Sequence, residues 1–403
     1  MRGFFGAVVR LYFRNIWTLG AIPKATARGT VFVANHPNGL VDPLLLLTQL
    51  PCQAAPLAKS TLWKVPGLAW LLNAAGAVPV FRKQDAAETG ATDNDAMFRR
   101  VAEHLASGGN ILLFPEGVSH DETRLLELRS GAARMLAKAW ESGARELSFV
   151  PIALHFDAKD VFRSRALMIF GESEPASLFA GEQGIEVERL REAMRRSLAD
   201  LLVDAPSRDE FDERILLAEM LSHESGKAAA QAAYQIAKAR ASSELCAAEL
   251  RAYRRELDSW DLCDSDVFAM HRGSYRASLW PWQLLGIAGA VLFYLPYRLT
   301  GQLAKKKSDG RDTTSTYKLG LALLLFPFCW LLLIGAALSL LKWPMAMIAS
   351  VLITLAPFAA LDRLDDPARK LAPRSQHFGA LWGLREGALS KIRQLQAGED
   401  HHR

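Results

Sequence analysis

Three uncharged, apolar runs near the C-terminus restrict what this chain can fold into more than any other feature. They cover Ala277–Tyr297, Leu319–Leu341 and Trp343–Leu361, and each approaches or reaches the roughly 20 apolar residues that a helix needs to span a bilayer. Most of the remaining sequence is of the ordinary globular kind, with aromatic and branched residues throughout, which excludes low-complexity disorder. The sequence therefore excludes both a purely soluble protein and a pure channel or carrier.

The stretch from Gly29 to about Asp200 alternates short apolar segments with helical ones. Strands are expected at Thr30–Ala34, Ala77–Val80, Asn110–Phe114, Phe149–Ala153 and Ala166–Phe170. Helices are expected between them, at Pro43–Leu50, Leu62–Ala74, Asp93–Ala106 and Ser130–Glu141. This alternation predicts an α/β domain whose largely parallel sheet is flanked by helices, with its chemistry in loops beyond the strand ends.

The sequence divides into five expected parts. Residues 1–28 form an amphipathic interfacial helix, because Arg10 and Arg14 interrupt the apolar core that a signal peptide requires; an ordinary surface helix is the alternative. Residues 29–205 form the α/β domain, and residues 206–272 form a helical hairpin insert rich in Ala, Glu, Lys, Arg and Leu. Residues 273–362 are the membrane region, and residues 363–403 are a cytoplasmic tail.

The orientation of the membrane region follows from charge. The loop Arg298–Lys318 is strongly basic, which places it in the cytoplasm by the positive-inside rule. If the α/β domain is also cytoplasmic, Ala277–Tyr297 cannot cross once by itself, so we expect an interfacial or re-entrant segment followed by a transmembrane hairpin. Three true spans are the alternative. The expected location is a multi-pass membrane protein with its α/β domain on the cytoplasmic face, in the plasma membrane if the Ala- and Arg-rich composition is bacterial.

Net charge limits which kinds of molecule the protein can bind, and the cysteine pattern indicates the redox compartment. The formal net charge is +5 with a pI near 9.0, which an anionic lipid surface or an anionic substrate explains. Binding of nucleic acid is not expected, because no basic domain with interleaved aromatic residues is present. The four cysteines include no C-x-x-C pair, which favours a reducing compartment over a disulfide framework or zinc ribbon.

Two polar motifs directly follow predicted strands. In the first, His36 and Asp42 could meet across a tight turn, so that the acid fixes the tautomer of the imidazole and leaves its other nitrogen to take a proton. In the second, Glu116 and Gly117 put a carboxylate and backbone amides at a strand end, where they could position a hydroxyl or an oxyanion. Alone, each pattern is as easily a surface histidine or an ordinary turn.

Three further segments have their own simpler interpretations. Arg82 ends a strand-like segment and suits a bidentate phosphate contact, although such an arginine is usually only a surface charge. The segment Val150–Ile152 by itself indicates only a strand. The run His120–Glu122 contains side chains that can bind a metal ion. Three adjacent residues cannot easily converge on one ion, so no metal is expected.

The order and spacing of these motifs resemble the four-block signature of the glycerolipid acyltransferase superfamily, which includes glycerol-3-phosphate and lysophosphatidate acyltransferases. Asn-His-x5-Asp-Pro is followed by Gly-x-x-x-Val-x-Arg, Phe-Pro-Glu-Gly and Val-Pro-Ile. Five residues separate His36 from Asp42, where most of the superfamily has four. That spacing is similar to the yeast-type glycerol-3-phosphate/dihydroxyacetone-phosphate acyltransferase branch, as are the segments Phe114–Asp121, Leu125–Gly131 and Phe162–Gly171.

The resemblance implies a role for each motif. His36 would be the general base that deprotonates the acceptor hydroxyl, Asp42 would orient it, and no serine or cysteine nucleophile would be needed. Glu116 and Gly117 would position the acceptor and the tetrahedral intermediate. Arg82, with Lys59 and Arg129, would bind the acceptor phosphate. The acyl path would be lined by Val150, Pro151 and Ile152. No cofactor is expected, because acyl-CoA or acyl-ACP would be a co-substrate.

One departure bears on the acceptor. Many superfamily members carry Thr-Arg-Ser after Phe-Pro-Glu-Gly, where the arginine contacts phosphate, but this chain has Val118, Ser119 and His120. Phosphate binding must then rest on other basic residues, with Arg124 and Arg129 nearby.

The expected function is acylation of the sn-1 hydroxyl of glycerol 3-phosphate, with lysophosphatidate or another lysophospholipid as the alternative acceptor. Expected partners are an acyl thioester donor, which could be carried by acyl carrier protein, a phosphorylated glycerol acceptor and membrane lipid. An inactive lipid-binding membrane scaffold is a further alternative, disfavoured because all the implied catalytic positions are occupied by suitable residues.

Overall fold

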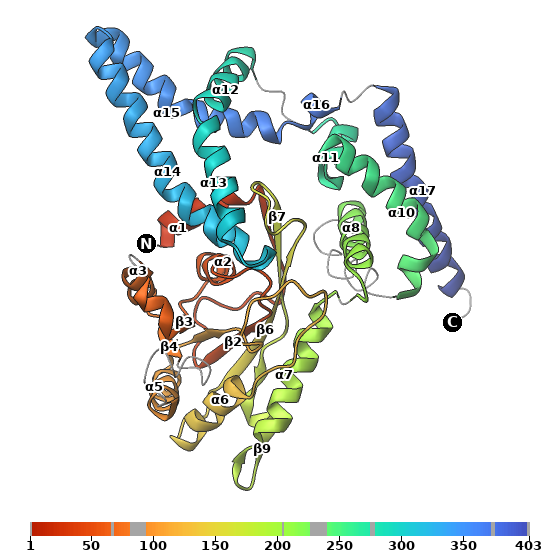
Figure 1. Cartoon of the computed structure of the whole chain (residues 1–403). Coiled ribbons are helices and arrows are strands. Elements are labelled where there is room, and N and C mark those ends of the chain that lie inside the picture. The colour runs from red at the N-terminus through yellow and green to blue at the C-terminus, as the bar shows by residue number, and fades with distance from the viewer. Residues whose placement is uncertain are drawn as a thin grey trace. The chain divides into compact units, whose positions relative to one another are not determined.

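The computed structural model of the chain describes residues 2–65, 68–80, 94–203, 205–225, 240–274, 279–371 and 375–400 (Figure 1). The chain forms two compact units. The first comprises Met1–Asp204 together with Gly310–Ser315, and the second comprises Ala205–Asp309 and Thr316–Arg403. A short segment that is distant in sequence is therefore part of the first unit.

The first unit is built on one sheet whose strands follow the order β1-β7-β6-β2-β5-β3-β4, with β8 paired to β6. The strand bounds are β1 Asn15–Gly20, β2 Thr30–Ala34, β3 Ala55–Lys59, β4 Val78–Val80, β5 Ile111–Leu113, β6 Ser148–Phe156, β7 Arg165–Phe170 and β8 Glu174–Pro175. β2 pairs in parallel with β5 and β6, and β3 with β4 and β5, whereas β6 pairs antiparallel with β7 and β8. The prediction of a largely parallel sheet flanked by helices is confirmed.

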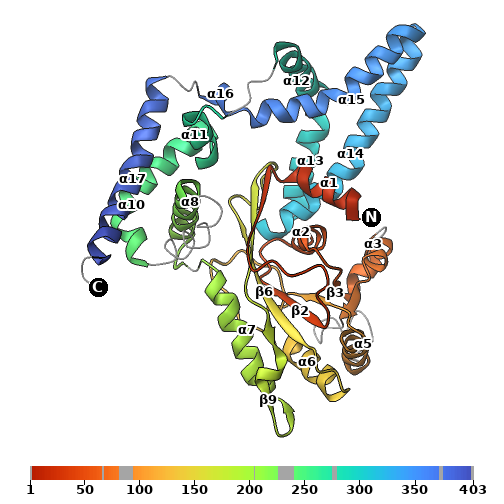
Figure 2. The ribbon, with the colours of Figure 1, turned by 180° about the vertical axis from the view of Figure 1, so that it is seen from behind.

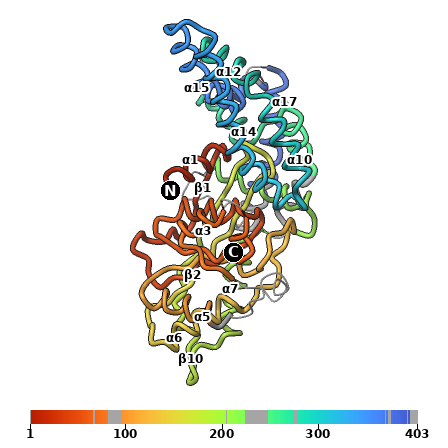
Figure 3. The backbone as a smooth tube through the Cα atoms, turned by 60° about the vertical axis from the view of Figure 1, so that its left-hand side comes forward, coloured from red at the N-terminus to blue at the C-terminus, as the bar shows by residue number. Residues whose placement is uncertain are grey.

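Helices pack against this sheet because its central strand is apolar on both faces. Every residue of β2 is buried, as is typical of a parallel strand covered on both sides. α6 contacts α5 and α7, and α7 contacts β6 (Figures 2 and 3). The helix bounds in this unit are α1 Arg2–Tyr12, α2 Val41–Gln49, η1 Ser60–Lys64, α3 Leu68–Ala74, α5 Asn94–Ala106, α6 Gly131–Glu141, η3 Ala176–Phe179 and α7 Val187–Leu201. A small hairpin of β9 (Ala180–Gly181) and β10 (Gly184–Ile185) precedes α7.

The prediction of one helix over residues 1–28 is wrong beyond Tyr12. Asn15–Gly20 forms β1, which pairs in parallel with β7 from Asn15 opposite Arg165 to Gly20 opposite Phe170. This partner lies far along the sequence, so the N-terminal pattern alone did not reveal it. Placement of the remaining helix, α1, in a membrane interface stays a prediction.

The second unit is helical, and it includes the segment expected to be a tail. Its helix bounds are α8 Arg208–Ser225, α10 Arg240–Trp260, α11 Asp264–His271, α12 Trp280–Leu292, α13 Tyr294–Lys307, α14 Arg311–Leu340, α15 Trp343–Asp365, α16 Pro367–Lys370 and α17 Gln376–Asp400. α8 packs on α10, in the region of the expected helical insert, and α17 also packs along α10 (Figure 1). The tail prediction is therefore wrong for 376–400, because the side chain of Arg385 on α17 is fully buried and paired with Asp264.

Two of the described helices, α14 and α15, are long and apolar enough to cross a membrane. α12 and α13 pass the same test only as a pair, bent by 51°. α12 packs closely on α15: a Cβ at Gly286 would lie 2.7 Å from the carbonyl oxygen of Ala359, and one at Gly289 would lie 2.1 Å from that of Ala356. Small residues thus allow these two helix backbones to approach, as in membrane helix pairs.

Candidate active site

Strands β2, β5 and β3 run parallel, so their carboxyl ends meet at one edge of the sheet. His36 follows β2, Glu116 follows β5, and Lys59 is the last residue of β3. The sheet therefore brings these three predicted site residues to a common edge. β4 also ends there, at Val80, but Arg82 lies outside the described residues.

His36 and Asp42 form a hydrogen-bonded pair. The imidazole Nδ1 lies 2.9 Å from Asp42 Oδ2, and the backbone N–H of Asn38 donates to the same oxygen at 2.7 Å. Asp42 lies in the first turn of α2 and is fully buried, whereas 17% of the His36 side chain is exposed. With Asp42 ionised, Nδ1 carries the proton and Nε2 keeps a lone pair that can accept one. The ring of Phe114 stacks on the imidazole, with centroids 4.0 Å apart.

The environment of Asp42 opposes its charge. Burial raises the pKa of this carboxyl, while the hydrogen bond and charge of His36, the N–H of Asn38 and the charge of Lys159 act to lower it. The net direction is upward. The pair therefore holds a carboxylate that ionises less readily than an exposed one.

Glu116 holds two loops together. Its Oε1 accepts a hydrogen bond from the backbone N–H of His36 at 2.9 Å. Its Oε2 accepts one from the backbone N–H of Leu126 at 3.1 Å and another from Nε2 of His120. Nδ1 of His120 faces the N–H of Glu122, so Nε2 carries the proton and donates to the carboxylate. Glu116 is only 3% exposed and its oxygens are engaged within the motif, so its direct effect is to fix the backbone at His36.

Gly117 occupies a position that only glycine adopts readily. Its φ is +78°, and a Cβ there would lie 2.6 Å from Nε of Arg129. The Gly117 N–H donates to the carbonyl of Phe114 at 3.0 Å, and the Arg129 N–H donates to that of Pro115 at 2.8 Å. The exposed guanidinium of Arg129 thus lies directly over the Pro-Glu-Gly turn, where a substrate phosphate could reach it.

The residues expected to line the acyl path lie elsewhere. Val150, Pro151 and Ile152 are in the middle of β6, opposite Phe32, Val33 and Ala34 of β2, and all three are buried. They are core positions of the sheet rather than members of the loops at its edge. Their acyl-binding role stays a prediction.

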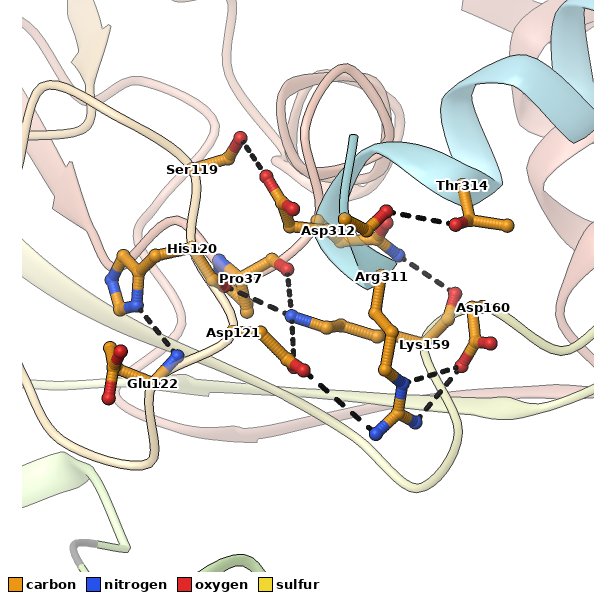
Figure 4. Close-up of polar contacts among 12 residues, drawn as sticks. Pro37, Ser119, His120, Asp121, Glu122, Lys159, Asp160, Arg311, Asp312 and Thr314 are labelled. Carbon is orange, nitrogen blue, oxygen red and sulfur yellow. Dashed lines mark hydrogen bonds and ion pairs between the residues drawn. The ribbon is translucent and has the colours of Figure 1, made fainter. Parts of the chain in front are cut away.

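Lys159 is a site residue that the motifs did not indicate. The residue is buried, with 6% of its surface exposed. Its ammonium group donates to the carbonyl oxygens of Pro37 at 2.6 Å and His120 at 3.0 Å (Figure 4). It also pairs with Asp121 at 2.8 Å. Strand β6 was expected to end at Ala153 but continues to Phe156, which brings Lys159 to the same sheet edge. A longer strand prediction would have placed this lysine correctly.

The side chains of His120 and Asp121 therefore turn to different partners, Glu116 and Lys159. Among the residues that the structure describes, no group of three or more His, Cys, Asp or Glu side chains is arranged to hold a metal ion.

Comparisons with known proteins match the part of the chain that contains this site. The model of the Acyltransferase family matches residues 18–155, which contain every site residue implied by the motifs. Two yeast proteins from Saccharomyces cerevisiae are similar: glycerol-3-phosphate O-acyltransferase 2, 31% identical over 123 residues, and glycerol-3-phosphate O-acyltransferase 1, 38% identical over 81 residues. These matches cover 29% and 20% of this chain, but only 17% and 11% of the yeast proteins.

A bacterial relative matches over a longer stretch. Lyso-ornithine lipid O-acyltransferase of Pseudomonas aeruginosa is 29% identical over 171 residues, which cover 40% of this chain and 57% of that protein. Among solved structures, the 1-acyl-sn-glycerophosphate acyltransferase PlsC of Thermotoga maritima has 22% identity and a TM-score of 0.38, with coverage of 49% of this chain and 75% of that one.

Proposed function

Because residues 18–155 form an acyltransferase domain of the glycerolipid type, we propose that this protein transfers a fatty acyl group from acyl-CoA or acyl-ACP to the sn-1 hydroxyl of glycerol 3-phosphate. The observation that carries the proposal is the His36–Asp42 pair, 2.9 Å apart at the sheet edge that also holds Glu116 and Lys59. The similarity to two yeast glycerol-3-phosphate O-acyltransferases supports this acceptor.

In the proposed reaction, Nε2 of His36 takes the proton of the acceptor hydroxyl as its oxygen attacks the thioester carbonyl carbon. Asp42 stabilises the imidazolium that forms. The tetrahedral intermediate then collapses, the carbon–sulfur bond breaks, and the leaving thiolate takes the proton from His36. Atoms and charge balance without an enzyme nucleophile or a resident cofactor.

The acceptor phosphate needs cations beside this pair. Arg129 lies over the Gly117 turn and Lys59 ends a strand at the same edge, and we assign both to phosphate binding together with Arg82. Ser119 and His120 bond to other protein groups, Asp312 and Glu116, so we do not assign them to phosphate binding.

A second candidate acceptor is a lysolipid. The match to lyso-ornithine lipid O-acyltransferase covers more of this chain than either yeast match. The same base and the same hydroxyl attack would serve this reaction, so the acceptor and not the mechanism distinguishes the two candidates.

We also propose that α12 and α13 do not cross the membrane. Only Leu341 and Lys342 separate α14 from α15, so if both helices span, the start of α14 and the end of α15 lie on one side. Trp282 near the start of α12 donates to Asp362 near the end of α15 at 2.8 Å, and α13 ends shortly before α14 begins. Both ends of the α12–α13 pair therefore lie on that side, and the basic end of α13 favours the cytoplasm.

The test is an acyl-transfer assay on the full chain in detergent with palmitoyl-CoA, offering glycerol 3-phosphate, lysophosphatidate and a lyso-ornithine lipid separately. We expect activity on glycerol 3-phosphate that disappears in His36→Ala and persists in His104→Ala, a matched substitution at an exposed histidine of α5. Activity on a lysolipid alone would select the second candidate. Inactivity on all three with both palmitoyl-CoA and palmitoyl-ACP would favour the scaffold alternative.

A further inference from the structure

The segment Gly310–Ser315, which begins helix α14, is part of the acyltransferase unit although more than a hundred residues separate it from the rest of that unit. Ser315 is fully buried and Thr314 is 6% exposed. A short segment that buries small polar residues against a distant part of the chain is held by specific contacts rather than by chance proximity.

Those contacts reach two residues, Ser119 and Asp121, of the loop after β5. Ser119 Oγ donates to Asp312 Oδ2 at 2.6 Å, and Nη1 of Arg311 lies 4.0 Å from Asp121 Oδ2 (Figure 4). His120, between these two residues, donates its backbone N–H to the carbonyl oxygen of His36 at 3.1 Å. The first turn of α14 thus holds the loop whose middle residue bonds directly to the backbone of the proposed base.

The start of α14 also forms hydrogen bonds with residues that follow β6. Arg311 donates to Asp160 at 3.0 Å, and the hydroxyl of Ser315 donates to the carbonyl oxygen of Lys159. Asn38, in the loop that carries His36, donates its side-chain N–H to that same carbonyl oxygen at 3.2 Å. One backbone carbonyl therefore connects the start of α14 with the His36 loop.

The Lys159 ammonium completes the connection. It has three N–H donors, and the acceptors around it are the carbonyls of Pro37 and His120 and the carboxylate of Asp121. A buried cation with all its donors used fixes the groups around it, because moving any of them leaves an unpaired charge in a poorly solvated place.

We infer that the first turn of α14 is a positioning element of the active site, with Arg311, Asp312 and Ser315 holding the loops on both sides of Lys159 so that His36 keeps its reactive geometry. The inference rests on the proposed function for its catalytic consequence. Ser119, which stands where many superfamily members have the arginine of Thr-Arg-Ser, is engaged with Asp312 in this arrangement.

The test compares Arg311→Ala with Arg195→Ala in the full chain in detergent. Both arginines pair with carboxylates, and their side chains are similarly exposed, 48% and 47%, but Arg195 is on α7. Displacement of catalytic groups by about 1 Å can cost on the order of 100-fold in rate, so we expect kcat to fall by roughly 10-fold or more in Arg311→Ala. KM values for both substrates and the melting temperature should stay close to wild type, and Arg311→Lys should recover most of the activity.

A second readout does not depend on activity. Diethyl pyrocarbonate modifies accessible imidazoles, and mass spectrometry gives the rate at His36 with His104 as an internal reference. We expect modification of His36 to be roughly threefold faster or more in Arg311→Ala than in Arg195→Ala, because the loop opens more often. If the wild type transfers no acyl group, the proposed function fails, and this measurement still decides the positioning role.

Two outcomes would overturn the inference. One is an Arg311→Ala protein that matches Arg195→Ala in both kcat and His36 reactivity. The other comes from the Ser119–Asp312 contact, tested with Ser119→Ala, Asp312→Ala and the double variant. If the fold-loss of kcat in the double variant equals the product of the two single losses, the two side chains do not act together. Should Arg311→Ala fail to fold, this pair of variants carries the test.

Discussion

At the scale of single residues, the proposed chemistry depends on one buried carboxylate, that of Asp42. Asn at position 42 removes the negative charge, although an amide oxygen at the Oδ2 position can still accept from Nδ1 of His36 and from the N–H of Asn38. The imidazolium that forms when His36 takes the substrate proton then has no anion beside it. We expect Asp42→Asn to lower kcat by roughly 10³–10⁴-fold, measured in the acyl-transfer assay.

The same substitution should not destabilise the fold. Burial raises the pKa of Asp42, so the folded state favours the neutral acid. Protonated Asp42 therefore stabilises the folded wild type at low pH, and this stabilisation is lost as the pH rises through the pKa that Asp42 has in the folded state. The melting temperature of Asp42→Asn relative to wild type should therefore increase from about pH 4 to pH 8. An equal decrease at every pH would show that the pair stabilises the fold instead.

At the scale of elements, the C-terminal helix is fixed by a buried ion pair. Arg385 of α17 donates to both oxygens of Asp264 of α11, at 2.7 and 3.2 Å, and Asp264 also accepts from Tyr253 of α10 and His223 of α8. Burial alone would raise the pKa of Asp264, but His223 and Arg385 outweigh it and hold the pKa below its usual value. Four helices therefore meet at one carboxylate.

Removing the cation should loosen this helical unit. We expect Arg385→Met to cost about 3–5 kcal/mol in stability, because it leaves a buried charge without its main partner. Lys391→Met, which removes a half-exposed pair with Glu249 on the same two packed helices α10 and α17, should cost about 1 kcal/mol or less. Thermal unfolding in detergent measures both, and equal effects would contradict a role for burial of the pair.

At the scale of the whole molecule, membrane topology is the property to measure. Single cysteines at Leu279, Ser308 and Lys342, in a chain whose own cysteines are replaced, report the side of the membrane by reaction with an impermeant maleimide in sealed vesicles. We expect Leu279→Cys and Ser308→Cys to react from the same side and Lys342→Cys from the other. Labelling of Leu279→Cys and Ser308→Cys from opposite sides would show that α12 and α13 form a span.

The parts predicted well are those whose signal is local. β2, β4, β5, β6 and β7 were expected within a few residues, because each is a short apolar run between turn residues. β3 was missed because Ala55–Lys59 contains a proline and no β-branched residue, and β1 because its residues continue an amphipathic pattern. α17 was missed because its buried position depends on Asp264, which lies 121 residues away.

The sequence by itself predicted the acyltransferase domain and the His36–Asp42 pair, because the spacing of a short motif is a local property that survives in the folded chain. Only the tertiary structure decided what holds that pair in place. The Lys159 ammonium and the first turn of α14 reach the site from distant segments, and no pattern near His36 encodes them. Their contacts exist because parallel strands bring their carboxyl ends to one edge, where loops far apart in the sequence become neighbours.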